Sequence, residues 1–189
     1  ISHPQFNIDN TLGFILLSRT KVEFDEIPDN LINALIATED IRFKNHSGID
    51  VRALFRAILG AVKGDVSSGG ASTITQQLAK MLFTEKPASG MQRVLQKLKE
   101  WVISVQLEKR YTKNEILTMY LNRFDWVNNA VGIESASKVY FNKEPINLEI
   151  EESAMLVGML KNPSLYNPNR RIELTTSRRD VVLHQMKKL

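Results

Sequence analysis

The chain has 189 residues, enough for one domain to bury a hydrophobic core without covalent cross-links. The absence of cysteine excludes disulfides and thiolate metal sites, and the three scattered histidines argue against a structural zinc site. The net charge of +4 suits an anionic partner such as a phosphate, a nucleic acid or an acidic membrane surface, although an ordinary basic domain would carry the same charge.

The N-terminal residues 1–28 are mixed in character. Thr11–Leu17 is apolar and partly β-branched and Lys21–Phe24 alternates, which predicts one or two short extended segments. We therefore separate an N-terminal extension, residues 1–28, from a domain over residues 29–189. No signal peptide is recognisable, nor is an apolar run of the roughly 20 residues that span a membrane, so we expect any membrane anchor to lie outside this sequence.

The remaining chain predicts a mainly α fold, with helices packed around one core. The first helix starts after Pro28, where apolar residues recur at helical spacing. Asp50 is expected to cap a helix over Val51–Lys63, and Ser72 to cap a helix that reaches about Phe83. Later helices are predicted from Met91, from the capping box Thr112–Glu115 to about Arg123, and over Ile133–Tyr140, Glu149–Leu160 and roughly Leu174–Lys188.

The helix that begins at Met91 has the clearest periodicity in the chain. Its apolar residues recur at i, i+3, i+4 and i+7 and predict a buried stripe: Met91, Val94, Leu95, Leu98, Trp101, Val102 and Val105. Arg93, Lys97 and Glu100 share a different face of the same helix. They either form ion pairs on a solvated surface or place two cations and a carboxylate beside an anionic group, and the spacing alone does not decide.

An adjacent acid pair, Glu39 and Asp40, ends the first predicted helix. Carboxylates at the end of a buried apolar run are costly unless they are paired or functional. Phe43 and His46 follow within a few residues, so Glu39 lies in a mixed polar and aromatic cluster that suits proton transfer. The alternative is that Glu39 lies at an exposed helix end or pairs with Arg42.

A second polar group, Ser72–Lys80, follows a glycine-rich loop over residues 67–71 and precedes another flexible loop over residues 84–90. Hydroxyls and unpaired N–H groups at a helix start, with a lysine two turns further on, suit an anion such as phosphate. The alternative is a well-capped helix with a polar face. The segment lacks the Gly-Lys-Ser/Thr ending of a Walker loop.

In combination, these motifs resemble the peptidoglycan glycosyltransferases of family 51, which occur alone or as the N-terminal domain of bifunctional class A penicillin-binding proteins. Five segments match the family in its order: Ala37–Gly48, Gly70–Lys80, Lys97–Glu100, Glu115–Asn122 and Gly158–Pro168. The first two are highly specific, and a chance match of all five is negligible.

The resemblance implies a lysozyme-like fold with two helical lobes around a substrate cleft. It also implies polymerisation of lipid II. Glu39 matches the general base that takes the proton from the acceptor's 4-hydroxyl, and that oxygen attacks the donor sugar with inversion. Glu100 matches the second catalytic carboxylate, near the donor pyrophosphate, where a divalent cation, Mg²⁺ or Mn²⁺, often assists. The residues expected to bind substrate are Asp40, Phe43, His46, Ser72, Thr73, Gln76, Gln77, Lys80, Arg93, Lys97, Tyr120 and Asn122.

The implied partners are lipid II, the nascent glycan strand and the outer or periplasmic face of the bacterial cytoplasmic membrane, with no nucleic acid. Whether a transpeptidase domain follows is left open. Membrane contact is expected between the second and third motifs, where Met81, Leu82, Phe83, Met91 and Leu95 flank a loop, with core packing preferred for Met91 and Leu95. The rival functions are a lysozyme-like enzyme that cleaves glycans with Glu39 as general acid, and a binding module without turnover.

The chain departs from the family pattern at several positions. Gln96 stands where an arginine usually precedes Lys97, and Arg93 is the candidate to compensate for it. Val127 and Asn129 stand where glycines are usual. None of these changes removes Glu39, Glu100, Lys80 or Lys97.

Overall fold

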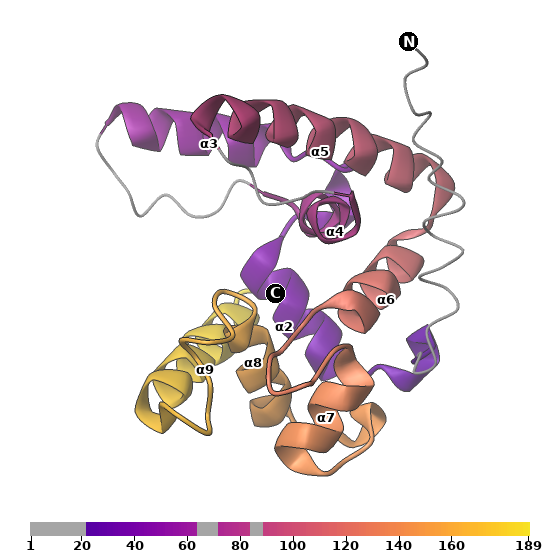
Figure 1. Cartoon of the computed structure of the whole chain (residues 1–189), viewed down its shortest axis with the longest axis vertical. Coiled ribbons are helices and arrows are strands. Elements are labelled where there is room, and N and C mark those ends of the chain that lie inside the picture. Colours follow the sequence, from indigo (N-terminus) through magenta and orange to yellow (C-terminus); the bar gives the residue numbers. More distant parts are fainter. Residues whose placement is uncertain (1–21, 64–71, 84–88) are drawn as a thin grey trace.

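A computed structural model describes residues 22–63, 72–83 and 89–189 of the chain (Figure 1). In these residues it contains eight α-helices and three short 3-10 helices, and the only β geometry is an isolated bridge between Asp125 and Val131. The predicted mainly α class is therefore confirmed. The extended segment expected over Thr11–Leu17 lies outside the described residues, and a 3-10 helix, Phe24–Glu26, begins where extended chain was expected at Phe24.

The lower part of the molecule in Figure 1 is built around a central helix that runs up toward the rest of the fold. This helix, α2, packs against both α8 and α9, which also pack against each other. Its apolar residues Leu31, Ile32, Leu35 and Ile36 are all buried, as the sequence predicts. The helices of this lower lobe are α2 (Asp29–Glu39), α6 (Lys113–Arg123), α7 (Ile133–Phe141), α8 (Ile150–Met159) and α9 (Ile172–Met186).

The upper part of Figure 1 contains the other three helices. They are α3 (Val51–Val62), α4 (Ile74–Phe83) and α5 (Gly90–Arg110). Helix α4 packs against α5 on one side and against α6 on the other, so it joins the two lobes. Residues on α4 can therefore contact side chains that come from both halves of the molecule.

Two of the predicted helix starts are confirmed and one is wrong. Asp50 accepts hydrogen bonds from the amides of Arg52 and Ala53, and Thr112 and Glu115 form the expected capping box. Ser72 does not cap α4. Instead, the hydroxyl of Thr73 accepts the amide of Gln76 at 3.1 Å, so the cap lies one residue later than expected.

The apolar stripe of α5 is the largest departure from expectation. Met91 is 73% exposed and Leu98 is 49% exposed, and Val94, Leu95 and Val102 are exposed as well. The face that α5 buries carries Glu100, Ser104 and Leu107. A periodic apolar pattern shows that residues share a face but not what covers that face, and here the opposite, mostly polar face packs inward.

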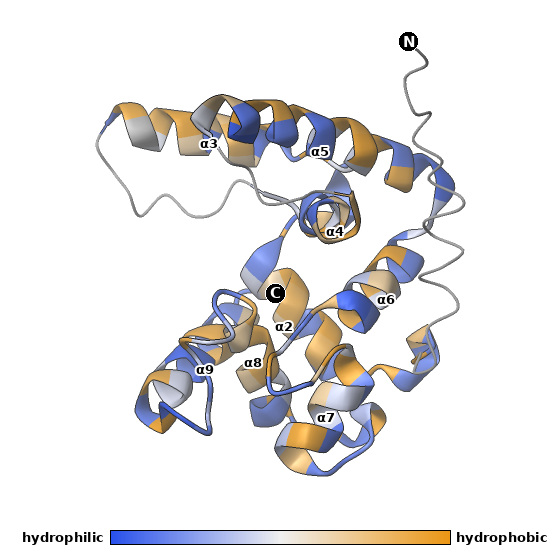
Figure 2. Ribbon diagram, viewed as in Figure 1, coloured by the Kyte–Doolittle hydropathy of each residue, from blue (hydrophilic) through white to orange (hydrophobic). Residues whose placement is uncertain are grey.

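Helix α3 repeats this arrangement. Its exposed apolar residues include Phe55 at 63% and Val62 at 81%, together with Val51, Ile58 and Leu59. Figure 2 shows the orange apolar residues of α3 and α5 at the same end of the molecule, away from α7 and α9. Several large apolar side chains exposed on neighbouring turns of a helix suit a contact site, and we call these residues of α3 and α5 the apolar face.

Candidate active site

Glu39 is the last residue of α2, and its side chain is only partly exposed. The side-chain amide of Gln77, on α4, donates a hydrogen bond of 2.8 Å to Glu39 Oε2. The carbonyl oxygen of the same amide accepts a hydrogen bond of 2.9 Å from the hydroxyl of Tyr120, on α6. Three helices therefore contribute to a chain of hydrogen bonds that ends on this carboxylate.

Asp40 follows Glu39 but points into the protein. Its carboxylate is buried, and Oδ2 accepts hydrogen bonds from His46 Nε2 at 2.9 Å and from the amide of Ile74 at 3.1 Å. The amide of Ile74 is one of the N-terminal amides that α4 cannot pair internally, and a negative charge at that end also suits the helix dipole. Asp40 therefore fixes both the loop after α2 and the start of α4.

Gly48 brings this loop into close contact with α5. Its φ is +92°, and a Cβ atom at this position would lie 2.8 Å from the backbone carbonyl carbon and oxygen of Ser104, so only glycine fits. The carbonyl of Gly48 accepts hydrogen bonds from the Thr73 hydroxyl at 2.7 Å and from the Gln76 side-chain amide at 3.3 Å. Thr73 and Gln76 are both buried, and these bonds direct their side chains to the protein backbone.

Phe43 and His46 are contacted by the lysine of a partly buried ion pair. Lys113 lies 2.7 Å from Glu108 and donates a 2.7 Å hydrogen bond to the carbonyl of His46. Its ammonium group also lies 4.2 Å from the centre of the Phe43 ring, which is fully buried. Thr75 donates to the same Glu108 carboxylate at 2.6 Å, which ties α4 to α5.

Glu100, on α5, is the second predicted catalytic carboxylate, and it is 5% exposed. The ammonium of Lys97 lies 3.2 Å from Glu100 Oε2 and donates a 2.9 Å hydrogen bond to the hydroxyl of Ser72. The carboxylate is buried and an uncompensated charge away from water is costly, so it needs such a partner, while the Lys97 side chain is itself 39% exposed. Ser72, which does not cap α4, instead accepts this hydrogen bond and so fixes the Lys97 ammonium beside Glu100.

The segment from Ser72 to Gln77 therefore serves both carboxylates. Ser72 holds the cation of the Glu100 pair, and Gln77 holds Glu39 itself. The arrangement provides one partly exposed carboxylate that can accept a proton. It also provides a second carboxylate paired with a lysine. The lysine can bind an anionic group, and the carboxylate can bind a cation.

The other predicted binding residues are placed less closely together. Lys80 and Arg93 are exposed, with Lys80 on α4 one turn beyond Gln77 and Arg93 on α5 one turn before Lys97. Asn122 exchanges two hydrogen bonds with the backbone of Val22, at 3.1 and 2.8 Å, and so holds the chain that enters the domain. Its contacts do not join it to the Glu39 or Glu100 clusters.

Tyr120 is buried, and its hydroxyl bonds to Gln77. Burial, together with the negative charge of Glu39, raises the pKa of Tyr120 well above its usual value. The phenol is therefore neutral at physiological pH and can serve as a hydrogen-bond donor.

Sequence reasoning missed Glu108 and Lys113 as supports of the site. Lys113 lies beside a capping threonine and reaches a carbonyl 67 residues earlier in the chain, which no local pattern could indicate. Thr75 lies within the second motif, but its partner Glu108 belongs to none of the five matched segments.

Within the described residues, no group of three or more histidine, aspartate or glutamate side chains could hold a metal ion. Glu100 is a single buried carboxylate that already bonds to Lys97. Magnesium commonly binds one or two protein carboxylates and takes its remaining ligands from water and substrate phosphates. On those terms Glu100 would offer a cation one carboxylate, and the remaining ligands would have to come from water or a bound phosphate group.

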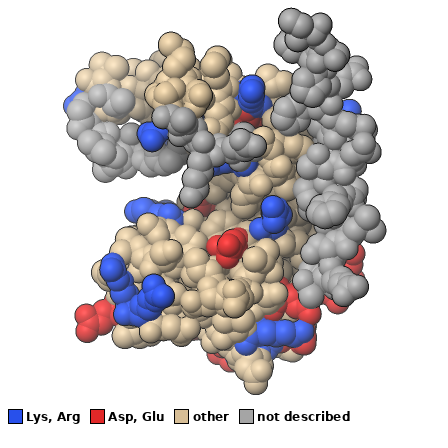
Figure 3. Space-filling view, in the orientation of Figure 1, with Lys and Arg blue, Asp and Glu red and all other residues tan. Residues whose placement is uncertain are grey.

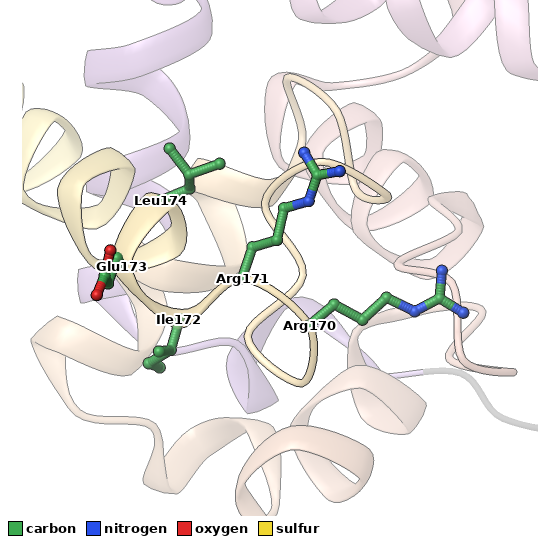
Figure 4. A pocket seen from close by; sticks show the side chains of 5 residues that line it. All are labelled: Arg170, Arg171, Ile172, Glu173 and Leu174. Carbon is green, nitrogen blue, oxygen red and sulfur yellow. The ribbon is translucent and has the colours of Figure 1, made fainter.

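Figure 3 shows Lys and Arg side chains at the left of the lower part of the molecule, on the edge that faces the part containing α3 to α5. A concavity of about 330 Å³ lies at the start of α9. It is lined by Arg170, Arg171, Ile172, Glu173 and Leu174, and both arginine side chains point away from Glu173 in Figure 4. It includes none of the predicted site residues.

Two carboxylates, Glu39 and Glu100, each with its own polar partner, form the candidate site of a helical enzyme domain. The transglycosylase family profile matches residues 10–187, almost the whole chain. The chain belongs to the transglycosylase family.

The relatives carry the names of penicillin-binding proteins. Penicillin-binding protein 2a of Streptococcus pneumoniae is 45% identical over 167 residues, 88% of this chain. Penicillin-binding protein 1A of Pseudomonas aeruginosa is 40% identical over 92% of the chain, and penicillin-binding protein 1F of Bacillus subtilis is 38% identical over 95%. The matched region makes up only 22%, 21% and 25% of these three proteins, respectively.

Proposed function

We propose that this domain polymerises lipid II into glycan strands, transferring the growing chain from its lipid pyrophosphate to the 4-hydroxyl of the next lipid II. The observation that carries the proposal is the division of the site into two clusters. Glu39 has an amide partner and partial exposure, while Glu100 is buried beside a lysine. Membership of the transglycosylase family supports the same reaction class.

On the acceptor side, Glu39 takes the proton from the 4-hydroxyl of lipid II as that oxygen attacks the anomeric carbon of the donor. The bond from that carbon to the pyrophosphate breaks, the electron pair leaves with the phosphate oxygen, and the configuration inverts. A sugar hydroxyl is a poor nucleophile at neutral pH, so a positioned base contributes roughly 10²–10⁴ in rate.

On the donor side, the leaving pyrophosphate gathers negative charge as the bond breaks. Lys97 is held in place by Ser72 and Glu100, and a preorganised cation stabilises such charge without having to reorganise during the reaction. Lys80 and Arg93 are the additional cations in this proposal. A Mg²⁺ or Mn²⁺ ion at Glu100 would supply further neutralisation of the pyrophosphate charge.

The substrate carries a lipid, so the domain must reach a membrane surface. The apolar face of α3 and α5 is the described surface that suits this contact, because it exposes large apolar side chains together with the neighbouring cations Arg52, Arg56 and Lys99. None of the described helices is long and apolar enough to cross a bilayer. We propose that the domain works at the outer face of the bacterial cytoplasmic membrane.

The rival reaction, cleavage of finished glycan, is less well supported. Cleavage of a neutral glycosidic bond releases no pyrophosphate. Lys97, held in place by Ser72 and Glu100, would then have no negatively charged leaving group to stabilise. Incubation with lipid II and, separately, with finished peptidoglycan distinguishes the two reactions by which substrate is consumed.

The decisive test is Glu39→Gln, which keeps the shape of the side chain but removes the base. We expect glycan chain formation from lipid II, followed on a gel, to fall by roughly 10²–10⁴ because the acceptor hydroxyl loses its proton acceptor. Binding of lipid II should remain, since the amide still fits the site.

The matched control is Glu134→Gln on α7, a partly exposed carboxylate that pairs with Lys138 on the lower lobe. It should polymerise at the parental rate. Full polymer formation by Glu39→Gln would remove Glu39 from the mechanism, and loss of lipid binding as well as turnover would leave only a binding role.

A further inference from the structure

Tyr120 is buried, but two consecutive hydrogen bonds connect its hydroxyl to Glu39, the proposed base. The side chain is fully buried on α6, with its ring stacked on Phe124 at 6.0 Å between ring centres. Its hydroxyl donates a 2.9 Å hydrogen bond to Gln77, and Gln77 in turn donates 2.8 Å to Glu39. An enclosed phenol has no access to a sugar, so its effect on the reaction must pass through Gln77.

The chemistry of the three groups fixes the direction of both hydrogen bonds. An ionised carboxylate only accepts, so Gln77 must turn its NH₂ group toward Glu39. Its carbonyl oxygen then faces Tyr120, which must donate. Because burial and the charge of Glu39 raise the pKa of Tyr120, the phenol keeps the proton that this arrangement needs.

We propose that Tyr120 is a positioning residue for the base: by fixing the orientation of the Gln77 amide, it holds Glu39 Oε2 and leaves Oε1 to receive the proton of the acceptor hydroxyl. A glutamate side chain at a partly exposed helix end otherwise samples several rotamers, and the reacting atoms must meet within a fraction of an ångström. The proposal rests on the function proposed for Glu39.

The test is steady-state polymerisation of lipid II by Tyr120→Phe, which removes one hydroxyl and preserves the ring packing. We expect kcat to fall about three- to tenfold, the equivalent of one hydrogen bond, with KM for lipid II unchanged. In a Gln77→Met chain the same Tyr120→Phe change should have no further effect on kcat, because the link to Glu39 is already broken. An unchanged kcat in Tyr120→Phe, or an equal loss in the Gln77→Met chain, would overturn the proposal.

Tyr140→Phe is the matched control. The Tyr140 hydroxyl donates to the carbonyl of Trp126 at 2.7 Å and lies on α7, away from the Glu39 cluster, so its loss also removes a tyrosine hydrogen bond. It should leave kcat unaltered, and a loss of kcat equal to that of Tyr120→Phe would show that general loosening is the cause, against the proposal.

If Tyr120→Phe does not fold, Gln77→Met alone still tests whether the hydrogen-bonded link to Glu39 affects kcat. Gln77 is only partly buried, and methionine retains its length. The kcat of Gln77→Met should fall at least as far as expected for Tyr120→Phe, and a parental kcat would contradict the proposal. Glu39→Gln in the same assay distinguishes failure of the proposed function from failure of this inference. An active Glu39→Gln would refute the role of Glu39 as the base. An inactive Glu39→Gln together with a fully active Tyr120→Phe would refute only the positioning role of Tyr120.

Discussion

At the scale of single residues, Val127 shows how a departure from the family pattern is accommodated. Val127 and Asn129, which stand where glycines are usual, have φ values of +60° and +62° and lie in the left-handed region. Asparagine tolerates this region, but a β-branched side chain does not. The turn is held in place by Trp126, whose ring nitrogen donates to the carbonyl of Leu156 at 3.0 Å.

We therefore expect Val127→Gly to stabilise the protein. Relief of the left-handed conformation is worth about 1–2 kcal/mol and exceeds the roughly 0.5–1 kcal/mol that glycine adds to the entropy of the unfolded chain. Urea unfolding should show a higher midpoint with an unchanged slope.

Val131→Gly is the control for this substitution. Val131 lies at the other end of the same turn, is exposed, and is not among the residues with positive φ. It should lower the midpoint, and a similar loss in Val127→Gly would show that the left-handed conformation carries no strain.

At the scale of elements, two faces of α5 have different surroundings. One face carries Lys97, buried Glu100 and buried Ser104, and it packs toward α4. The other carries the apolar face. The membrane contact expected at Leu82 and Phe83 is better assigned to α3 and α5, because both of those residues are partly buried against the core.

We expect the double substitution Leu95→Ser and Leu98→Ser to weaken binding to phosphatidylglycerol vesicles by about tenfold or more in a flotation assay. The reason is the loss of apolar area that enters the lipid, at about 25 cal/mol per Å². Because both side chains are half exposed, the free energy of unfolding should change by no more than about 0.5 kcal/mol each.

The matched control is Val139→Ser with Ile146→Ser, two exposed apolar residues of the lower lobe, at 47% and 50%. This pair should float as the parent protein does. Equal binding by all three proteins would remove the apolar face from the membrane contact.

At the scale of the whole molecule, local patterns predict the helices and the motif residues predict the family. The stripe Leu31, Ile32, Leu35 and Ile36, the Asp50 cap and the Thr112–Glu115 capping box are confirmed because each depends on neighbours within a few residues. The buried stripe predicted for α5 is wrong because burial depends on which elements cover a helix, and this information is not local.

The site follows the same division. Glu39 and Glu100 could be selected from their motifs, but their supports could not. Gln77 reaches Glu39 across 38 residues, and Lys113 reaches His46 across 67. The functions of Ser72 and Tyr120 depend on such long-range contacts, so the sequence could include them in a site but could not say what each one touches.

Global stability should fall in alkaline solution. Tyr120 and Tyr140 have raised pKa values, mainly because burial disfavours the phenolate. In the unfolded chain both ionise near about pH 10, so above that pH the folded state holds more protons than the unfolded state. Stability is then lost as pH rises, by up to about 1.4 kcal/mol per pH unit for the buried Tyr120 and by less for the partly exposed Tyr140.

Denaturant unfolding at a series of pH values from about 9 to 11 measures this slope. Lys138 and Lys143, whose pKa values are raised by hydrogen bonds to glutamates, lose stabilising charge in the same direction. The comparison of the parent with Tyr120→Phe isolates the contribution of Tyr120, and the variant should show the shallower slope. Identical slopes would mean that the phenol is not enclosed.

The two faces of α5 also set the distance between the residues proposed to bind the pyrophosphate and the surface that the apolar face contacts. A helix with its side chains is about 10–12 Å thick, and the proposed pyrophosphate residues Lys97 and Glu100 lie across that thickness from the apolar face. If that face rests in the bilayer, the leaving group stays at the level of the lipid phosphates and its hydrocarbon tail need not leave the membrane. Each sugar would then be added at one constant distance above the bilayer, however long the strand becomes.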